Sequence, residues 1–246
     1  MRHDTLDLPD GRSIAYHRSP GRGTGVVFLG GFRSDMTGTK AQFLEAWARA
    51  QGRAFLRFDY TGHGASSGDF LACGIGDWAR DAEDAVARLT EGPQVLVGSS
   101  MGGWIALLLA ARLPAHVAGI VGIAVAPDFT EDSMWAGFDS AARERLMAEG
   151  QIELPSDYSE EPYGITRRLI EDGRRHLVLR DRLDLPFPVR LLHGTADADV
   201  ARSVPLRLLD HAACPDMRLT LVKGADHRFS SPEALDLIAA TIEEIL

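Results

Sequence analysis

The chain has 246 residues, of which 45% are hydrophobic and 25% are charged. These proportions are those of an ordinary globular protein, and they exclude a disordered chain, a collagen and a coiled coil. The formal net charge is -9, so phosphate backbones and anionic lipids would repel the chain, and no nucleic-acid partner is expected. Because α/β domains often reach about 250 residues, we expect a single domain over residues 1–246.

The cysteines and the N-terminal residues carry no sign of a metal site, a disulfide or a membrane anchor. Cys73 and Cys214 lie far apart and lack the spacing of a zinc site or a disulfide framework. We therefore expect no bound metal and a reducing compartment. Residues 1–10 have no apolar core, so neither a signal peptide nor an anchor is expected. The most apolar stretch, residues 104–111, is much shorter than the roughly 18 to 20 residues that span a bilayer.

In chain order, the first predicted element is an antiparallel hairpin, in which residues 5–8 and 12–17 flank a Pro-Asp-Gly turn. Short apolar runs bounded by glycine, proline or charge follow, and they are typical of strands buried on both faces. They cover residues 26–29, 54–58, 95–97, 120–125, 189–192 and 219–222. Helical patterns alternate with them at residues 40–51, 76–90, 101–112, 200–213 and 232–246. This alternation predicts an α/β fold in which a mostly parallel, eight-stranded sheet carries helices on both faces.

One interval, residues 127–188, breaks the alternation because it holds no convincing strand. Helical stretches are predicted within it near residues 139–149 and 166–172. A compact sheet protein would not carry so long a loop without structure of its own. We therefore expect this interval to form a small helical cap over the edge of the sheet.

The sharpest motif is Gly-Ser-Ser-Met-Gly at residues 98–102, which follows the strand predicted at residues 95–97. It is a G-x-S-x-G pattern between a strand and a helix, where the glycines leave room for backbones that approach closely. Ser100 is therefore the candidate nucleophile. The alternative is a glycine-rich turn without chemistry, because the pentapeptide alone is a weak signal.

A base and an orienting carboxylate follow the serine in the chain. A serine hydroxyl needs the base to act as a nucleophile, and the base needs the carboxylate. Asp197 follows the strand predicted at residues 189–192, and His227 precedes the last helix, so the order is Ser, Asp, His. Asp197 would fix the tautomer of His227, which would take the proton from Ser100 and return it to the leaving group. Asp199 remains an alternative to Asp197. Supporting roles in their loops are expected for Asp226 and His193.

Backbone donors must also stabilise the tetrahedral intermediate of such a reaction. Met101 follows the nucleophile and would supply one N–H. The loop Gly30-Gly31-Phe32 follows the strand predicted at residues 26–29, and we expect the second N–H from Phe32. In the alternative interpretation, the two glycines only form a turn.

With these motifs, the sequence resembles the α/β-hydrolase superfamily over essentially its whole length. The stretches that carry the resemblance are residues 30–32, 58–66, 98–102, 193–197 and 226–227. The first of these loops more often begins with histidine in the superfamily, where this chain has Gly30. Within the superfamily, the chain looks like the mitochondrial serine hydrolases described as palmitoyl-protein thioesterases and acyl-glucuronide esterases. The matching stretches are residues 35–41, 57–60, 92–104, 158–161 and 190–194.

The resemblance implies that Ser100, Asp197 and His227 hydrolyse acyl thioesters or carboxylic esters through an acyl-enzyme, without a cofactor. The substrate would be a small-molecule ester or thioester, or an acylated protein. A cytoplasmic enzyme is expected, because residues 1–10 contain the first strand and do not look like a transit peptide. Two other hypotheses stay open. One is a carbon–carbon bond hydrolase or perhydrolase with the same triad, and the other is a non-catalytic ligand-binding protein of the same fold. No oligomeric state is predicted.

The predicted cap is expected to select the substrate. Its aromatic residues are candidates for lining an acyl pocket, although aromatic residues at helical spacing belong to a core more often. They are Trp135, Phe138, Tyr158 and Tyr163. A group of arginines nearby would either bind an anionic group or form a solvated helix face. These arginines are Arg167, Arg168, Arg174 and Arg175.

Overall fold

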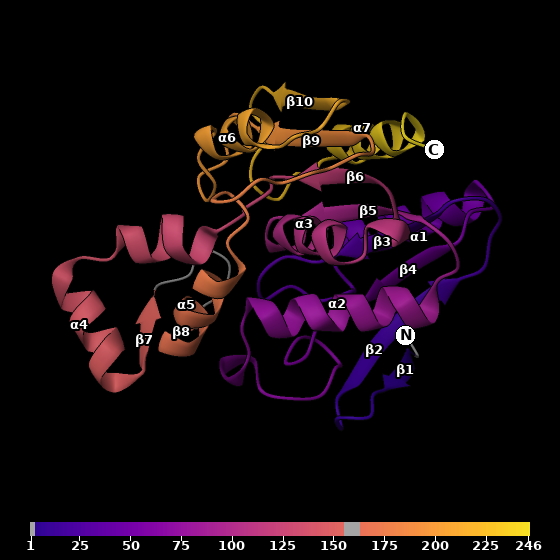
Figure 1. Cartoon of the computed structure of the whole chain (residues 1–246). Coiled ribbons are helices and arrows are strands. Elements are labelled where there is room, and N and C mark those ends of the chain that lie inside the picture. The colour runs from indigo at the N-terminus through magenta and orange to yellow at the C-terminus, as the bar shows by residue number, and fades with distance from the viewer. Residues whose placement is uncertain (1–2, 155–162) are drawn as a thin grey trace.

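The computed structural model describes residues 3–154 and 163–246, and its centre is an eight-stranded sheet (Figure 1). The strand order is β1-β2-β4-β3-β5-β6-β9-β10. The hairpin β1–β2 and the pair β2–β4 are antiparallel, and every other pair is parallel. The strands are β1 (Asp4–Asp7), β2 (Ser13–Ser19), β3 (Gly25–Leu29), β4 (Phe55–Phe58), β5 (Gln94–Ser99), β6 (Val117–Ile123), β9 (Val189–Gly194) and β10 (Met217–Val222).

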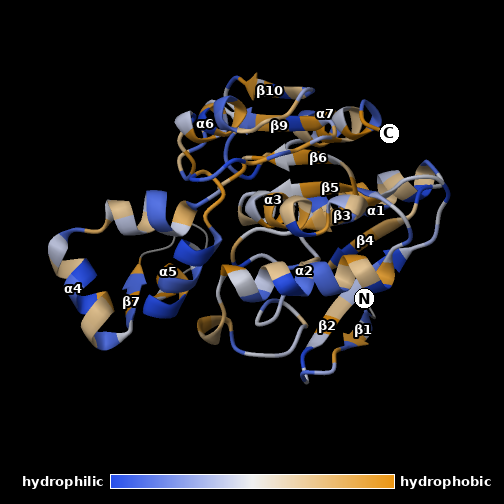
Figure 2. Ribbon diagram, in the orientation of Figure 1, coloured by the Kyte–Doolittle hydropathy of each residue, from blue (hydrophilic) through white to orange (hydrophobic). Residues whose placement is uncertain are grey.

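Helices cover both faces of this sheet, because the buried strands send alternate side chains to opposite sides. Val26 and Phe28 of β3 pack in the core that includes α1 and α7, whereas Val27 and Leu29 pack in the core that includes α2 and α3. Figure 2 shows the result as apolar colour concentrated in the central strands and α3. The helices are α1 (Thr39–Ala50), α2 (Ile75–Leu89), α3 (Met101–Arg112), α6 (Ser203–His211) and α7 (Pro232–Glu243). Short 3-10 turns lie at Phe70–Ala72, Pro114–His116 and Arg174–His176.

The α/β fold predicted from the sequence is confirmed. Each predicted strand of the main sheet and each predicted helix is present, with ends displaced by a few residues. Among the described helices, none combines the length and the apolarity needed to cross a bilayer.

The segment between β6 and β9 projects beyond the main body at the left of Figure 1. It contains a π-helical turn (Thr130–Trp135), α4 (Ser140–Glu149), the strands β7 (Gln151–Leu154) and β8 (Tyr163–Thr166), and α5 (Arg167–Gly173). The expectation that residues 127–188 hold no strand is wrong, because β7 and β8 pair antiparallel. Each strand is only four residues long, so any alternation in it is too brief to stand out in the sequence.

Candidate active site

Ser100 lies on a sharp turn between β5 and α3. Its φ is 54° and its ψ is -118°, which is a strained conformation for a residue with a side chain. The two glycines of the motif are required sterically. A Cβ at Gly98 would lie 2.4 Å from the Gly102 carbonyl oxygen, and a Cβ at Gly102 would lie 2.0 Å from the Leu29 carbonyl oxygen. The turn therefore presents the Ser100 side chain at the carboxyl end of the sheet.

The three candidate side chains form a continuous chain of hydrogen-bonding groups. Nε2 of His227 lies 3.1 Å from Oγ of Ser100, and Nδ1 of His227 lies 2.9 Å from Oδ2 of Asp197. Residues 127 positions apart in the sequence meet here, because the carboxyl ends of β5, β9 and β10 share one edge of the sheet. The geometry is that of a nucleophile, a base and an orienting group.

Asp197 is fully buried, and its two oxygens have different partners. Oδ1 accepts hydrogen bonds from the backbone N–H groups of Asp199 and Val200 at 2.9 and 2.8 Å, which leaves Oδ2 for His227. Burial alone would raise the pKa of Asp197, but the hydrogen bonds from His227 and from the Val200 backbone outweigh it and hold the pKa below its usual value. The carboxylate therefore stays ionised beside the imidazole.

The alternative carboxylate, Asp199, is farther from the histidine. Its Oδ2 lies 4.0 Å from Nδ1 of His227, beyond hydrogen-bond distance. Atoms of Asp197, Asp199 and His227 lie within 4.8 Å of one another and are of types that can hold a metal ion. Oδ2 of Asp197 and Nδ1 of His227 already face each other, so an ion there would have to replace that hydrogen bond.

The other two loop residues singled out in the sequence lie close to the triad but do not enter it. His193 is buried beneath Asp197, with Nε2 3.9 Å from Oδ2, and burial lowers its pKa. Asp226 is exposed and accepts a hydrogen bond from the backbone N–H of Phe229 at 3.0 Å, which shapes the loop after His227.

The loop after β3 comes close to the serine. A Cβ on Gly31 would lie 3.5 Å from Cβ of Ser100, so only a small residue lets the backbone pass so near. The N–H groups of Phe32 and Met101 donate to no protein acceptor among the described residues. Both are therefore available to an oxygen atom of a bound molecule.

A cavity of about 570 Å³ opens onto Ser100 and His227. Much of its wall is apolar, and charged side chains of the loop after β3 stand beside the apolar part. The apolar wall is formed by Phe32, Phe129, Met134, Tyr163, Val200 and Val204. A volume of this size is typical of sites for small organic molecules.

The structure separates the aromatic residues that were candidates for the pocket. Tyr163 lines the cavity, whereas Trp135 and Phe138 are not among its lining residues and pack on each other with ring centroids 6.4 Å apart. Tyr158 lies outside the described residues. Phe129 and Met134 also line the cavity and were not predicted from the sequence.

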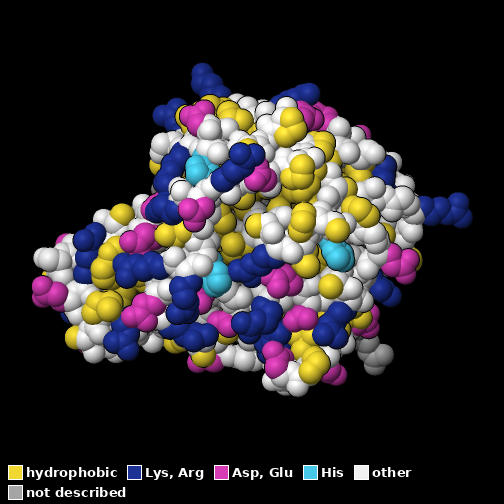
Figure 3. Space-filling view, in the orientation of Figure 1, with side chains coloured by type: hydrophobic (Ala, Val, Ile, Leu, Met, Phe, Trp, Pro, Cys, Tyr) yellow, Lys and Arg dark blue, Asp and Glu magenta, His cyan; other side chains and the backbone are white. Residues whose placement is uncertain are grey.

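The arginines of α5 and the turn after it are engaged in ion pairs. Arg168 contacts Asp77 at 2.7 Å, and Arg174 contacts Glu131 at 2.6 Å and lies over the ring of Trp135. Figure 3 shows basic and acidic side chains interspersed across this face. The arrangement favours a solvated, ion-paired surface over a binding site for an anionic group.

Lys40 also lines the cavity, although no sequence motif marked it as a site residue. Its ammonium group donates to the carbonyl oxygen of Arg228 and lies 3.5 Å from Oγ of Ser230, so α1 holds the loop after His227. Burial lowers the pKa of Lys40 to about 8, although Asp226 opposes this shift. The available signal was its rarity, because the chain contains only one other lysine, Lys223.

Known proteins resemble the chain over its full length. The sequence pattern of the alpha/beta hydrolase family matches residues 26–240. The rat (Rattus norvegicus) protein named palmitoyl-protein thioesterase ABHD10, mitochondrial, is 35% identical over 242 residues, which are 98% of this chain and 81% of that protein. A crystal structure of a protein from Agrobacterium vitis has a TM-score of 0.94 at 39% identity, covering 100% of this chain and 99% of that one. Mouse alpha/beta hydrolase domain-containing protein 10 has a TM-score of 0.93 at 33% identity, covering 100% and 98%.

These relatives contradict the expected cytoplasmic location. The rat, bovine and mouse proteins carry names that place them in mitochondria. The expectation rested on the composition of residues 1–10. That composition describes the start of a sheet and is not a physical determinant of the compartment.

Proposed function

Because the chain belongs to the alpha/beta hydrolase family, we propose that it is a serine hydrolase that cleaves acyl thioesters or carboxylic esters through an acyl-enzyme. Ser100 is the nucleophile, His227 the base and acid, and Asp197 the group that orients the histidine. The observation that carries this proposal is the hydrogen-bond chain from Asp197 through His227 to Ser100, at the wall of a cavity large enough for an organic substrate.

In the first half of the reaction, Oγ of Ser100 attacks the carbonyl carbon of the substrate while Nε2 of His227 takes the hydroxyl proton. The negative charge that develops on the carbonyl oxygen is stabilised by the N–H groups of Phe32 and Met101. Met101 is the first residue of α3, so the positive end of the helix dipole also faces this oxygen. His227 then protonates the departing thiol or alcohol, which leaves the acyl group on Ser100.

In the second half, the same groups act on water. His227 takes a proton from a water molecule, whose oxygen attacks the acyl carbon, and Ser100 is released when the imidazolium returns the proton. Asp197 stabilises the imidazolium in both halves, because its free oxygen faces Nδ1 and its other oxygen is held by the backbone.

The segment at residues 127–188 serves as the cap of a single domain and contributes to substrate choice. Phe129, Met134 and Tyr163 come from this segment and line the cavity that also contains Ser100. An apolar acyl chain packs better against an apolar wall than against a charged wall. The name of the rat relative, palmitoyl-protein thioesterase, agrees with an acyl thioester as the substrate class.

The test is a comparison of hydrolysis rates over a series of acyl chains, from acetyl to palmitoyl, as matched oxygen esters and thioesters. We expect Ser100→Ala to lower kcat/KM by at least about 10,000-fold for every substrate, since the nucleophile is lost. The fold of the variant is checked by circular dichroism. A preference for long thioesters would support a depalmitoylating role, and a preference for short oxygen esters a general esterase.

Labelling distinguishes this proposal from its alternatives. A fluorophosphonate should modify wild-type protein at Ser100 and leave the Ser100→Ala variant unmodified. Absence of labelling in folded wild-type protein, together with equal hydrolysis by both proteins, would contradict the proposal and favour a non-catalytic binding protein. Labelling without hydrolysis of any ester or thioester would point to carbon–carbon bond hydrolysis or perhydrolysis.

A further inference from the structure

The residue after the proposed oxyanion donor has a strained backbone. Arg33 follows Phe32 and has a φ of 56°, a left-handed value that favours glycine. A turn of four residues encloses it, because the backbone N–H of Ser34 donates to the carbonyl oxygen of Gly31 at 3.2 Å. Strained conformations of this kind persist only where neighbouring groups hold them.

A second loop supplies the groups that hold this turn. Nε2 of His63 lies 3.2 Å from the backbone nitrogen of Arg33 and accepts its N–H. Three residues farther along, the backbone N–H of Met36 donates to Oδ1 of Asp59 at 2.6 Å. His63 and Asp59 both belong to the loop after β4, so this loop holds the segment after β3 through two hydrogen bonds.

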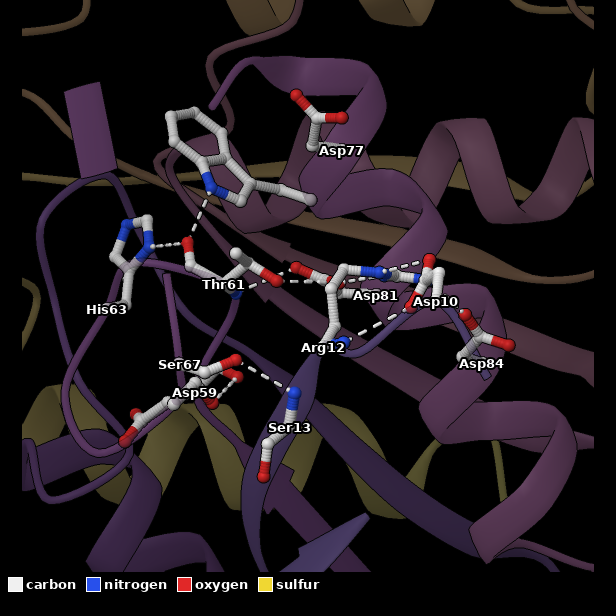
Figure 4. A network of polar contacts seen from close by, with 12 residues as sticks. Asp10, Arg12, Ser13, Asp59, Thr61, His63, Ser67, Asp77, Asp81 and Asp84 are labelled. Atoms are coloured by element: carbon white, nitrogen blue, oxygen red, sulfur yellow. Dashed lines mark hydrogen bonds and ion pairs between the residues drawn. The ribbon is translucent and has the colours of Figure 1, made fainter. Parts of the chain in front are cut away.

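The loop after β4 is itself anchored to the sheet. In Figure 4, the backbone N–H of Ser13 on β2 points to Oγ of Ser67, which it reaches at 2.8 Å. Oδ2 of Asp59 accepts the backbone N–H of Ala65 at 2.8 Å and closes the loop on itself. The acceptor on His63 is therefore presented by a rigid support.

His63 can accept this hydrogen bond only as a neutral imidazole of one tautomer. Nδ1 lies 3.3 Å from the carbonyl oxygen of Thr61, which can only accept, so Nδ1 carries the proton and Nε2 the lone pair. Rings of Tyr60, Phe70 and Trp78 enclose the imidazole edge-on at 5.0–5.6 Å. This burial lowers the pKa of His63 to about 4, so the neutral form persists at neutral pH.

We propose that His63 is a positioning residue for the reaction. By accepting the N–H of Arg33, it fixes the turn that carries the Phe32 N–H beside Ser100. Without that acceptor, Arg33 leaves the left-handed region, and the Phe32 N–H moves with it. Displacements of about 1 Å at a reacting centre lower rates by roughly 100-fold. This proposal rests on the proposed function, because Phe32 acts as a donor only in that reaction.

The surroundings of His63 allow a clean substitution. In His63→Phe the ring remains but the acceptor is lost. The carbonyl oxygen of Thr61 still has a donor, since Nε1 of Trp78 lies 3.0 Å from it. Of the two backbone groups that contact His63, only the Arg33 N–H then loses its partner. Ser67→Ala is the matched control. It removes one side-chain hydrogen bond of the same loop, but the backbone N–H of Ser67 still donates to the carbonyl oxygen of Ser13 at 2.9 Å, so the contact between His63 and Arg33 stays in place.

The experiment measures kcat and KM for p-nitrophenyl butyrate, and the inhibition constant of a trifluoromethyl ketone that forms a tetrahedral adduct with serine. We expect His63→Phe to lower kcat by about 100-fold and to raise the inhibition constant of the ketone by a similar factor. KM should change less than about threefold. Ser67→Ala should change kcat less than about threefold. His63→Gln, whose amide oxygen reaches the place of Nε2, should recover a large part of the loss.

Three outcomes would overturn the proposal: unchanged kcat in His63→Phe, equal losses in KM and kcat, or a loss in Ser67→Ala as large as that in His63→Phe. If His63→Phe does not fold, His63→Gln and His63→Asn are compared instead. The shorter side chain of asparagine does not reach the Arg33 N–H, so equal kcat values in these two variants would reject the proposal. Failure of the proposed function is distinguishable, because it would appear as wild-type turnover that does not depend on Ser100.

Discussion

The two carboxylate oxygens of Asp197 have different partners. The effect of replacing the carboxylate by an amide can therefore be predicted. Oδ1 faces the backbone N–H groups of Asp199 and Val200, so in Asp197→Asn the amide oxygen takes that place and the NH₂ group faces His227. Two donors cannot face each other, so the imidazole must move its proton to Nε2. It can then no longer accept the proton of Ser100.

We therefore expect Asp197→Asn to lower kcat by about 10,000-fold with little change in stability. Steady-state kinetics and thermal unfolding measure the two quantities. Asp199→Asn is the control for the alternative assignment, and it should lose less than about tenfold, since Asp199 lies beyond hydrogen-bond distance of the histidine. Losses in the reverse order would assign the orienting role to Asp199.

Besides the ion pair of Arg168 with Asp77, a carboxylate on α5 holds the segment between β6 and β9 to the start of α2. Oδ2 of Asp172 on α5 accepts the backbone N–H of Gly76 at 2.7 Å. It acts as the N-terminal cap that α2 lacks, because the residue at that position is Gly74. A Cβ at Gly74 would lie 2.6 Å from the same oxygen, so the glycine makes room for the partner helix.

Asp172→Ala is expected to lower the free energy of unfolding by about 1–2 kcal/mol at neutral pH, the usual effect of a lost helix cap. Burial would raise the pKa of Asp172, but hydrogen bonds from His176, the Gly76 backbone and Arg175 hold it well below its usual range. The stability that the carboxylate contributes is therefore complete above its unfolded pKa of 3.8 and is lost as the pH falls through the lower folded value.

Urea unfolding of wild type and Asp172→Ala at several pH values tests this prediction. The difference between them should be constant above about pH 5 and should shrink on further acidification. Glu171→Gln is the control on the same helix, because Glu171 is exposed and lies 3.9 Å from Arg167, a pair that contributes little. A difference that grows at low pH would contradict the assigned role of Asp172.

The central strands of the sheet were easy to predict because they have many buried side chains. Strands such as β3 and β5 are buried along their whole length, so their apolar runs are unmistakable. The strands β7 and β8 are only four residues long, too short for a recognisable pattern, and were missed. The proximity of Ser100, Asp197 and His227 was predictable because each follows a strand, and the three strands end at the same edge of the sheet. The contact between His63 and Arg33 was not, since it depends on how two loops cross in space.

At the scale of the whole molecule, one polar network joins the hairpin β1–β2 to α2 (Figure 4). The guanidinium of Arg12 contacts Asp10, Asp81 and Asp84, and Asp81 is completely buried. Asp81 also accepts the backbone N–H of Thr61 at 2.7 Å. The network thus ties an edge of the sheet, the loop after β4 and a covering helix to one carboxylate.

Removing the guanidinium in Arg12→Met would leave that buried carboxylate without its counter-charge. We expect the free energy of unfolding to fall by about 3 kcal/mol, measured by urea denaturation. Asp81→Asn in the same chain should recover part of the loss, because the amide oxygen can still accept from Thr61. Arg88→Met is the control, since Arg88 is half exposed and pairs with Asp84 at 3.3 Å. Equal effects of the two arginine substitutions would reject this account.

The position of the segment between β6 and β9 has a consequence for the history of such proteins. These two strands are hydrogen-bonded neighbours in the sheet, and parallel neighbours always need a crossover connection. The crossover here is free to lengthen, because the strands on either side keep their register whatever lies between them. Gene segments that encode it can therefore diverge or be exchanged between lineages. Such changes leave in place the frame that holds Ser100, Asp197 and His227 together.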